Sequence, residues 1–204
     1  MTLKALWGVR IRIVASCAVA LSLAACSDAT RQGQGSTYLI VTSLQGAPGA
    51  TPGSFGTPLL SDVVNQVGSP PAPTFFNDLG QVTMQLAMKD PGGSAAPQTP
   101  TQNNFVTIDR YHVEYVRSDG HNVPGVDVPF AFDGAVTVTV SGTATFAFTI
   151  VRNQAKEEAP LKALQTSPVV ITTIAQVTFY GHDQTGRGVT ATGSLEIAFG
   201  NFAG

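Results

Sequence analysis

Cysteine is almost absent from this chain of 204 residues, which contains only Cys17 and Cys26. The sequence after Cys26 therefore has no thiol for a disulfide, a zinc–thiolate site or an iron–sulfur site. Charge is also sparse, because charged residues make up 12% of the chain. Residues 26–204 hold eight basic and 13 acidic side chains, a formal charge of −5. That sign argues against nucleic acid or an anionic membrane surface as a partner.

Motifs of catalysis are also lacking. After Cys26 there is no Gly-x-Ser-x-Gly elbow, His-Glu-x-x-His helix, phosphate-binding loop or Gly-x-Gly-x-x-Gly turn. A carboxylate pair for glycoside hydrolysis needs only proximity in space, so the sequence leaves that chemistry open. The residues favour a noncatalytic protein without a cofactor, and a hydrolase with a site built from long loops is the rival interpretation.

The first 26 residues carry the most specific pattern. Lys4, Arg10 and Arg12 precede an apolar run that begins at Ile13 and ends in Leu23-Ala24-Ala25-Cys26. A basic start, a short apolar core and small residues before a cleavage point are the parts of a secretory signal. The run is shorter than the roughly 20 apolar residues that a membrane-spanning helix needs.

This leader resembles the signal sequence of bacterial lipoproteins, whose lipobox ends in a cysteine. The resemblance implies cleavage between Ala25 and Cys26, a diacylglycerol thioether on Cys26, and an acyl chain such as palmitate on its new amino group. Two or three acyl chains hold a protein stably on a membrane. Ser27 follows the cysteine, where Asp would favour retention at the inner membrane, so the resemblance implies the outer membrane. An ordinary signal peptide with an incidental cysteine, or a buried helix, is the alternative.

Three segments follow from this pattern. Residues 1–25 are predicted to be the signal peptide, residues 26–35 a flexible tether of small polar residues, and residues 36–204 one β-sandwich domain.

Alternation of apolar and polar residues dominates the domain, as expected for strands with one buried face. It predicts that Ser141-Gly142 forms a tight hairpin turn between two strands. A continuous β-branched run at residues 169–180 predicts a central strand, and the strand at residues 105–116 is expected to change face near Asp109 and Arg110. The residues predicted to point into the core are Val136, Val138, Val140, Phe146, Phe148, Leu195, Ile197 and Phe199.

The remaining segments complete the predicted fold. Residues 38–44 and 82–88 are predicted to form strands, and residues 59–67 are predicted to form a strand or a short helix. Segments rich in Pro, Gly, Ala and Thr at 45–58, 68–74 and 90–101 read as loops, and 154–165 as one short helix between the sheets. The sequence thus predicts an all-β, antiparallel two-sheet sandwich with one short helix.

Residues 105–200 resemble immunoglobulin-like and fibronectin type III-like sandwiches. The resemblance rests on Tyr111 to Tyr115 followed by Asp119-Gly120, and on Gln176 to Gly186 followed by Gly193 to Phe199. The Cys-Trp-Cys core of true immunoglobulin domains is absent, since the only Trp is Trp7. The resemblance therefore implies a fold and no function.

Candidate site residues are few. His112 shares a strand face with Arg110 and Glu114, which is typical of a solvated polar stripe, with a ligand or proton-transfer site as the alternative. His121 and His182 read as turn residues. Asp119, Asp127 and Asp133 read as turn residues or, alternatively, as a calcium site between loops. Two aromatic pairs, Phe75-Phe76 and Phe130 with Phe132, read as core or edge packing, with a ligand platform as the alternative.

The sequence thus predicts the cellular location more specifically than the function. We expect a lipid-anchored cell-envelope protein, held to the membrane through the lipid on Cys26, that is a noncatalytic binding or structural module for another envelope protein or a glycan. An accessory subunit of a secretion or surface assembly is the alternative, and it would use a sheet edge or the Pro/Gly loops.

Overall fold

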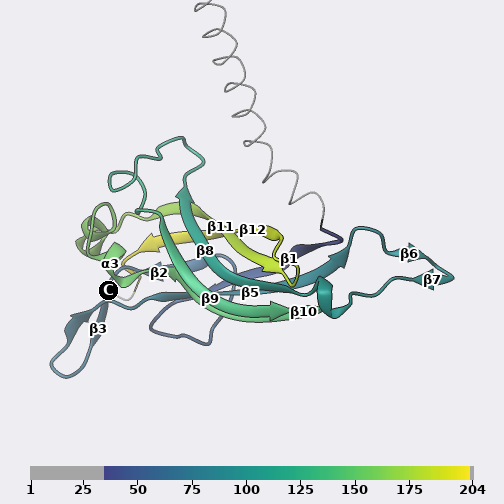
Figure 1. Cartoon of the computed structure of the whole chain (residues 1–204). Coiled ribbons are helices and arrows are strands. Elements are labelled where there is room, and N and C mark those ends of the chain that lie inside the picture. Colours follow the sequence, from purple (N-terminus) through teal and green to yellow (C-terminus); the bar gives the residue numbers. More distant parts are fainter. Residues whose placement is uncertain (1–34, 203–204) are drawn as a thin grey trace, which may run out of the picture. The chain divides into compact units, whose positions relative to one another are not determined.

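The computed structural model describes residues 35–202, most of which lie in β-strands. The prediction of an all-β protein is confirmed (Figure 1). The elements, in chain order, are β1 (Thr37–Ala47), β2 (Leu59–Asp62), β3 (Asn65–Val67), β4 (Ala72–Thr74), β5 (Asp78–Met88), β6 (Gly92–Gly93), β7 (Ala96–Pro97), η1 (Gln102–Asn104), β8 (Val106–Val116), β9 (Phe132–Val140), β10 (Thr143–Val151), α3 (Asn153–Lys156), η2 (Leu161–Thr166), β11 (Ile171–Asp183) and β12 (Gly188–Gly200).

Two main sheets contain the long strands. One has the order β1-β5-β10 and the other the order β2-β12-β11-β8-β9. The run at residues 169–180 becomes β11, which lies inside the larger sheet as predicted. The prediction of purely antiparallel sheets was wrong in one place, because Leu59–Asp62 pairs with Ile197–Gly200 in parallel. Alternation identifies a strand but does not give the direction of its partner.

The predicted hairpin at Ser141-Gly142 was also wrong. The turn is tight, but β9 pairs with β8 whereas β10 pairs with β5. The chain thus crosses from one sheet to the other at this turn, and the carbonyl of Gly142 accepts a hydrogen bond from the Leu86 N–H at 2.7 Å. β9 and β10 each turn one face towards the common core. The alternation of apolar and polar residues is therefore the same whether the two strands belong to one sheet or to two sheets.

The alternation itself is confirmed. Val140, Phe148, Leu195, Ile197 and Phe199 are buried, and the other predicted core residues, Val136, Val138 and Phe146, are half-buried on the same faces. β8 changes face as predicted, because its pairing with β9 shifts between Ile108 and Arg110 and leaves Asp109 exposed at a bulge.

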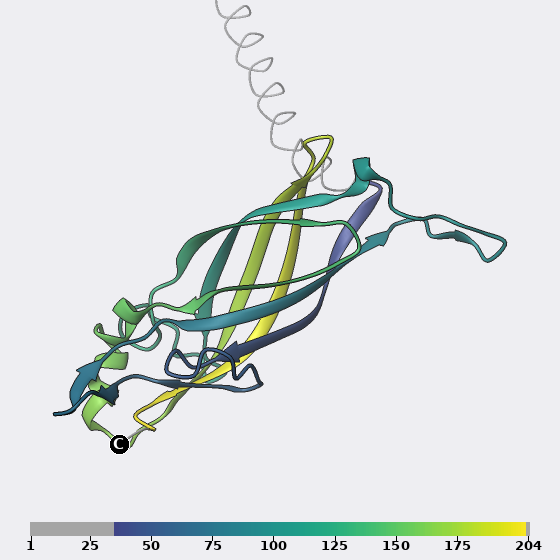
Figure 2. The ribbon, with the colours of Figure 1, turned by 90° about the horizontal axis from the view of Figure 1, so that it is seen from below.

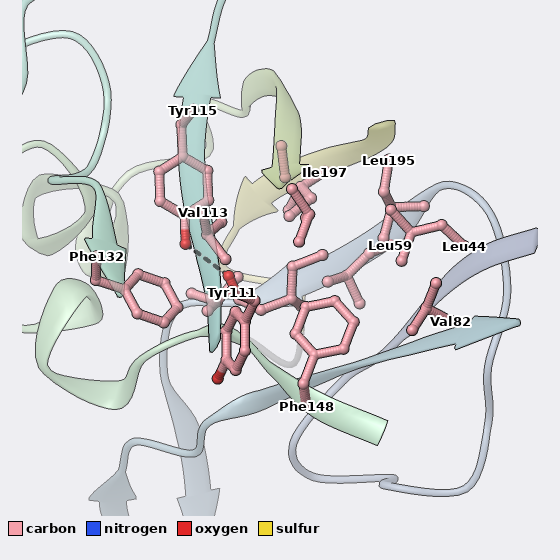
Figure 3. Packing of buried hydrophobic residues seen from close by; sticks show 14 of the residues in the cluster. Leu44, Leu59, Val82, Tyr111, Val113, Tyr115, Phe132, Phe148, Leu195 and Ile197 are labelled. Carbon is pink, nitrogen blue, oxygen red and sulfur yellow. Dashed lines mark hydrogen bonds between the residues drawn. The ribbon is translucent and has the colours of Figure 1, made fainter. Parts of the chain in front are cut away.

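Aromatic side chains join the sheets across the core (Figure 3). The Tyr111 ring of β8 meets the Phe148 ring of β10 with centroids 4.9 Å apart, and Phe148 meets Phe179 of β11 at 5.2 Å. Both pairs have the edge-to-face geometry that aromatic rings prefer. The buried Tyr115 hydroxyl donates to the Ile150 carbonyl at 2.7 Å, so its polar end is satisfied.

The predicted helix at residues 154–165 is two short helical segments, α3 and η2. Pro160 lies between them, and its ring nitrogen cannot donate the hydrogen bond that a continuous helix requires. The segment does link β10 to β11 and so bridges the two sheets. Two of the predicted loops also contain small ribbons, β3 with β4 and β6 with β7.

The described domain has two ends (Figure 2). We call the end at which β1 begins the tether end, where Thr37 lies opposite Met88 and its hydroxyl donates to the Asn104 carbonyl. The opposite end, the far end, is formed by segments 48–77, 117–131, 152–170 and 201–202, which connect or follow the strands there.

Candidate functional site

The predicted lipid site lies outside the described residues. Ala25 and Cys26 precede residue 35, so the cleavage and acylation of this leader remain predictions. Among residues 35–202, no helix is long and apolar enough to cross a membrane.

The three histidines each pair with a different carboxylate. His112 Nδ1 lies 3.2 Å from Asp133, His182 Nδ1 lies 3.2 Å from Asp109, and His121 Nδ1 lies 3.5 Å from Asp119. Arg110 joins the first pair at 3.6 Å from Asp133. The partners are exposed or half-buried, so this part of the sheet is a solvated polar face. Within residues 35–202, no group of three or more His, Cys, Asp or Glu is placed to hold a metal ion.

The three aspartates that were considered as calcium ligands each have a different partner in the protein. Asp119 pairs with the Arg117 guanidinium, Asp127 accepts from the Val123 N–H at 3.0 Å, and Asp133 bonds to His112. The hydrogen bonds from Arg117 lower the pKa of Asp119 to about 2. Asp119 and Asp127 thus have partners within four residues, as turn residues do. The prediction of Asp133 as a turn residue was wrong, because Asp133 lies in β9 and bonds across to His112 of β8.

The predicted aromatic pairs do not form a platform. Phe130 is exposed whereas Phe132 is buried, so the two rings do not share a face. Phe75 is half-buried and packs against the core.

A buried ion pair lies at the far end. Lys156 at the end of α3 is 1% exposed and places Nζ 2.8 Å from Asp78 Oδ1 at the start of β5. The same carboxylate accepts the Gly49 N–H at 2.8 Å and the Ser61 hydroxyl at 2.5 Å. One carboxylate therefore joins four segments that are distant in the sequence, which makes the ion pair a structural clasp.

Burial determines the electrostatics of this pair. Desolvation raises the pKa of Asp78 from its ordinary value, against the opposing effect of Lys156 and three hydrogen bonds. Burial likewise raises the pKa of Tyr115, and the charge of Asp78 adds to the effect. Removal of one charged partner should therefore be costly, since the other would be left in a place from which water is excluded.

No local pattern in the sequence indicates this ion pair. Asp78 follows Asn77, and an Asp beside such a residue usually indicates a turn. Lys156 precedes two glutamates, and such a position usually indicates a solvated helix end. The apolar Ala155 next to it is a weak signal of an inward-facing turn, because Ala155 is also buried.

A hollow of about 280 Å³ opens beside the clasp. Two mostly buried polar side chains, Asp62 and Asn65, lie among apolar ones. Asp62 Oδ1 accepts the Phe202 N–H at 3.2 Å, which fixes the backbone of the residue whose ring lines the hollow. The lining residues are Pro48, Ala50, Thr51, Leu60, Asp62, Asn65 and Phe202.

Exposed hydrophobic side chains gather at the same end. Of the large hydrophobic residues exposed within 35–202, Tyr38, Ile40 and Ile174 lie on the long strands β1 and β11. Contiguous apolar patches mark interaction sites, whereas single exposed residues are ordinary. The others are Leu60, Val67, Val123, Val126, Phe130, Val169, Val170 and Phe202, all at the far end.

Comparisons with known proteins give no family. No family model and no curated protein matches the chain. A solved structure described as the X-ray structure of Northeast Structural Genomics Consortium target SoR45 is similar over 79% of this chain and 86% of that chain, with 10% identity and a TM-score of 0.36.

Proposed function

We propose that this chain is a lipid-anchored protein of the bacterial cell envelope. Its parts are an acylated Cys26, a tether and a noncatalytic immunoglobulin-like binding domain. The observation that carries the proposal is the Leu23-Ala24-Ala25-Cys26 pattern ahead of the domain, together with the exposed apolar residues at the far end of that domain. The outer membrane is the proposed location, because Ser27 follows Cys26.

The order of the strands supports the immunoglobulin-like part of the proposal. When the long strands are lettered along the chain, β1, β5 and β10 take the places of A, B and E in one sheet. β8, β9, β11 and β12 take the places of C, C′, F and G in the other. Immunoglobulin-like sandwiches carry their binding loops at the ends of the sheets, which is where this domain has its longest connections.

The geometry favours binding over catalysis. The described histidines are held apart by separate carboxylates, and the most buried charged pair is fully engaged with its neighbours. In contrast, the far end combines apolar side chains with a hollow. An acylated Cys26 would join the domain to the membrane through the tether, and the exposed far-end side chains would be available to another envelope component.

Metabolic labelling with a fatty-acid analogue tests the anchor. The wild-type protein should take up the label, and Cys26→Ser should lose both the label and the cleavage of the leader. Cys17→Ser is the matched control, because it removes the other cysteine without changing the lipobox, and it should be labelled like the wild type. Label that persists on Cys26→Ser, or is lost from Cys17→Ser, would contradict the proposed anchor.

A further inference from the structure

The amide of Asn65 is a polar group among the apolar walls of the far-end hollow. Asn65 is 8% exposed, and no hydrogen bond to its side chain is present within residues 35–202. The side-chain atoms of this range that are both sealed from water and without a partner are Arg152 Nε and Thr173 Oγ1, so the Asn65 amide is open to the hollow. An Asn amide offers two donor hydrogens and an acceptor oxygen, and a molecule that enters the hollow can bond to them.

Asp62 provides a complementary group beside it. This carboxylate is 9% exposed, and among the described residues only the Phe202 N–H bonds to it, through Oδ1. Its other oxygen is an acceptor. The hollow therefore presents an acceptor and an amide donor together, surrounded by Leu60, Ala50 and the exposed ring of Phe202.

We propose, on the basis of the binding function proposed above, that this hollow binds an N-acetylated amino sugar of an envelope glycan. The acetamido group has an N–H for Asp62, a carbonyl for the Asn65 amide and a methyl group for the apolar wall. The C–H face of the sugar ring packs on the ring of Phe202, whose face carries partial negative charge. The volume of about 280 Å³ suits one sugar residue.

The surroundings favour a sugar over an added peptide strand. β2 is the outermost strand of its sheet, but the chain folds back beside it: Gly46 and Gly56 exchange two hydrogen bonds of 2.9 Å. A second hollow on this segment is lined by Gly46, Gly56 and both Leu59 and Leu60. The segment that precedes β2 is thus paired with β1 and lies close to Leu59 and Leu60 at the start of β2, where an added strand would meet it.

The test compares two oligosaccharides with the full-length protein in detergent micelles. Chitohexaose and cellohexaose share the same β-1,4-linked backbone, but only chitohexaose has acetamido groups. Saturation-transfer NMR should show binding of chitohexaose, with the strongest transfer at the acetamido methyl, and at least about tenfold weaker binding of cellohexaose. Equal binding of the two, or no binding of chitohexaose, would overturn the proposal.

Variants locate the binding in the hollow. Asn65→Ala and Phe202→Ala should each weaken chitohexaose binding about tenfold, whereas Thr137→Ala on the exposed face of β9 should leave it unchanged. Unfolding midpoints establish that the variants are folded, and Phe202 provides an independent test if the Asn65 variant is not. Unchanged binding in a folded hollow variant would overturn the assignment, as would equal binding of an N-acetylated dipeptide. These results do not depend on acylation, so they are separate from the labelling result at Cys26.

Discussion

The clasp between Lys156 and Asp78 should be one of the most sensitive points of the fold. Lys156→Met keeps most of the side-chain volume but leaves the Asp78 carboxylate buried without its counter-charge. Loss of one partner of a buried pair costs about 3–5 kcal/mol. The two remaining hydrogen bonds from Gly49 and Ser61 place the expected loss at the lower end of that range. For a domain of this size, a loss of about 3 kcal/mol corresponds to a fall in Tm of about 6–12 °C.

A double-mutant cycle separates this effect from a loss of packing. Asp78→Asn alone should also destabilise the protein, because it leaves the Lys156 ammonium buried. The double variant, Asp78→Asn with Lys156→Met, is neutral, and its amide can still bond to Gly49 and Ser61. Its loss should therefore be at least about 2 kcal/mol smaller than the sum of the two single losses.

Urea unfolding at pH 7 and pH 5 measures these energies. Without Lys156, the pKa of the buried Asp78 should rise further above its unfolded value of 3.8. A raised folded-state pKa means that stability falls as the pH rises through it, so Lys156→Met should be less destabilising at pH 5 than at pH 7. Lys162→Met is the matched control, because Lys162 is exposed on the adjacent η2. Strictly additive losses in the cycle, or an equal loss for Lys162→Met, would refute the reasoning.

Two further predictions concern the core and the acid range. Phe148→Ala should lower the free energy of unfolding by about 3–5 kcal/mol, because the Phe148 ring packs against both sheets. Thr137→Ala on an exposed face should lower it by less than about 0.5 kcal/mol. Equal losses for the two variants in urea unfolding would contradict the assigned faces. Asp119 has a pKa of about 2 against 3.8 unfolded, so its stabilising effect is present above pH 4 and lost as the pH falls towards 2. The stability gap between the wild type and Asp119→Asn should therefore close on acidification, and a gap that is the same at pH 5 and pH 2 would contradict the pairing with Arg117.

Strand faces were predictable because alternation records burial residue by residue. The buried Ile197 and Phe199 follow from their own sequence, and even the face change at Asp109 was visible as a break in period. Strand partners were not predictable, because β9 and β10 have the same alternation whether they pair with each other or with different sheets. The parallel pairing of β2 with β12 was not predictable either, because alternation does not give the direction of a partner strand.

The candidate site was less predictable than the fold. Asp62 and Asn65 come from a segment whose pattern predicts a strand or a short helix equally well. Phe202 lies 140 positions after Asp62 in the sequence. Their convergence depends on β2 pairing with β12, which is a tertiary event. The clasp residues, Asp78 and Lys156, are likewise 78 positions apart and carry no local pattern.

The intact mass of the mature protein, purified from bacterial membranes, tests the central claim most directly. The account predicts a chain that begins at Cys26 and carries the added mass of a diacylglyceryl group and an amide-linked acyl chain, both located on the N-terminal peptide by fragmentation. An unmodified Cys26, or a mature chain that begins at another residue, would contradict the claim that this domain is held to the envelope by a lipid.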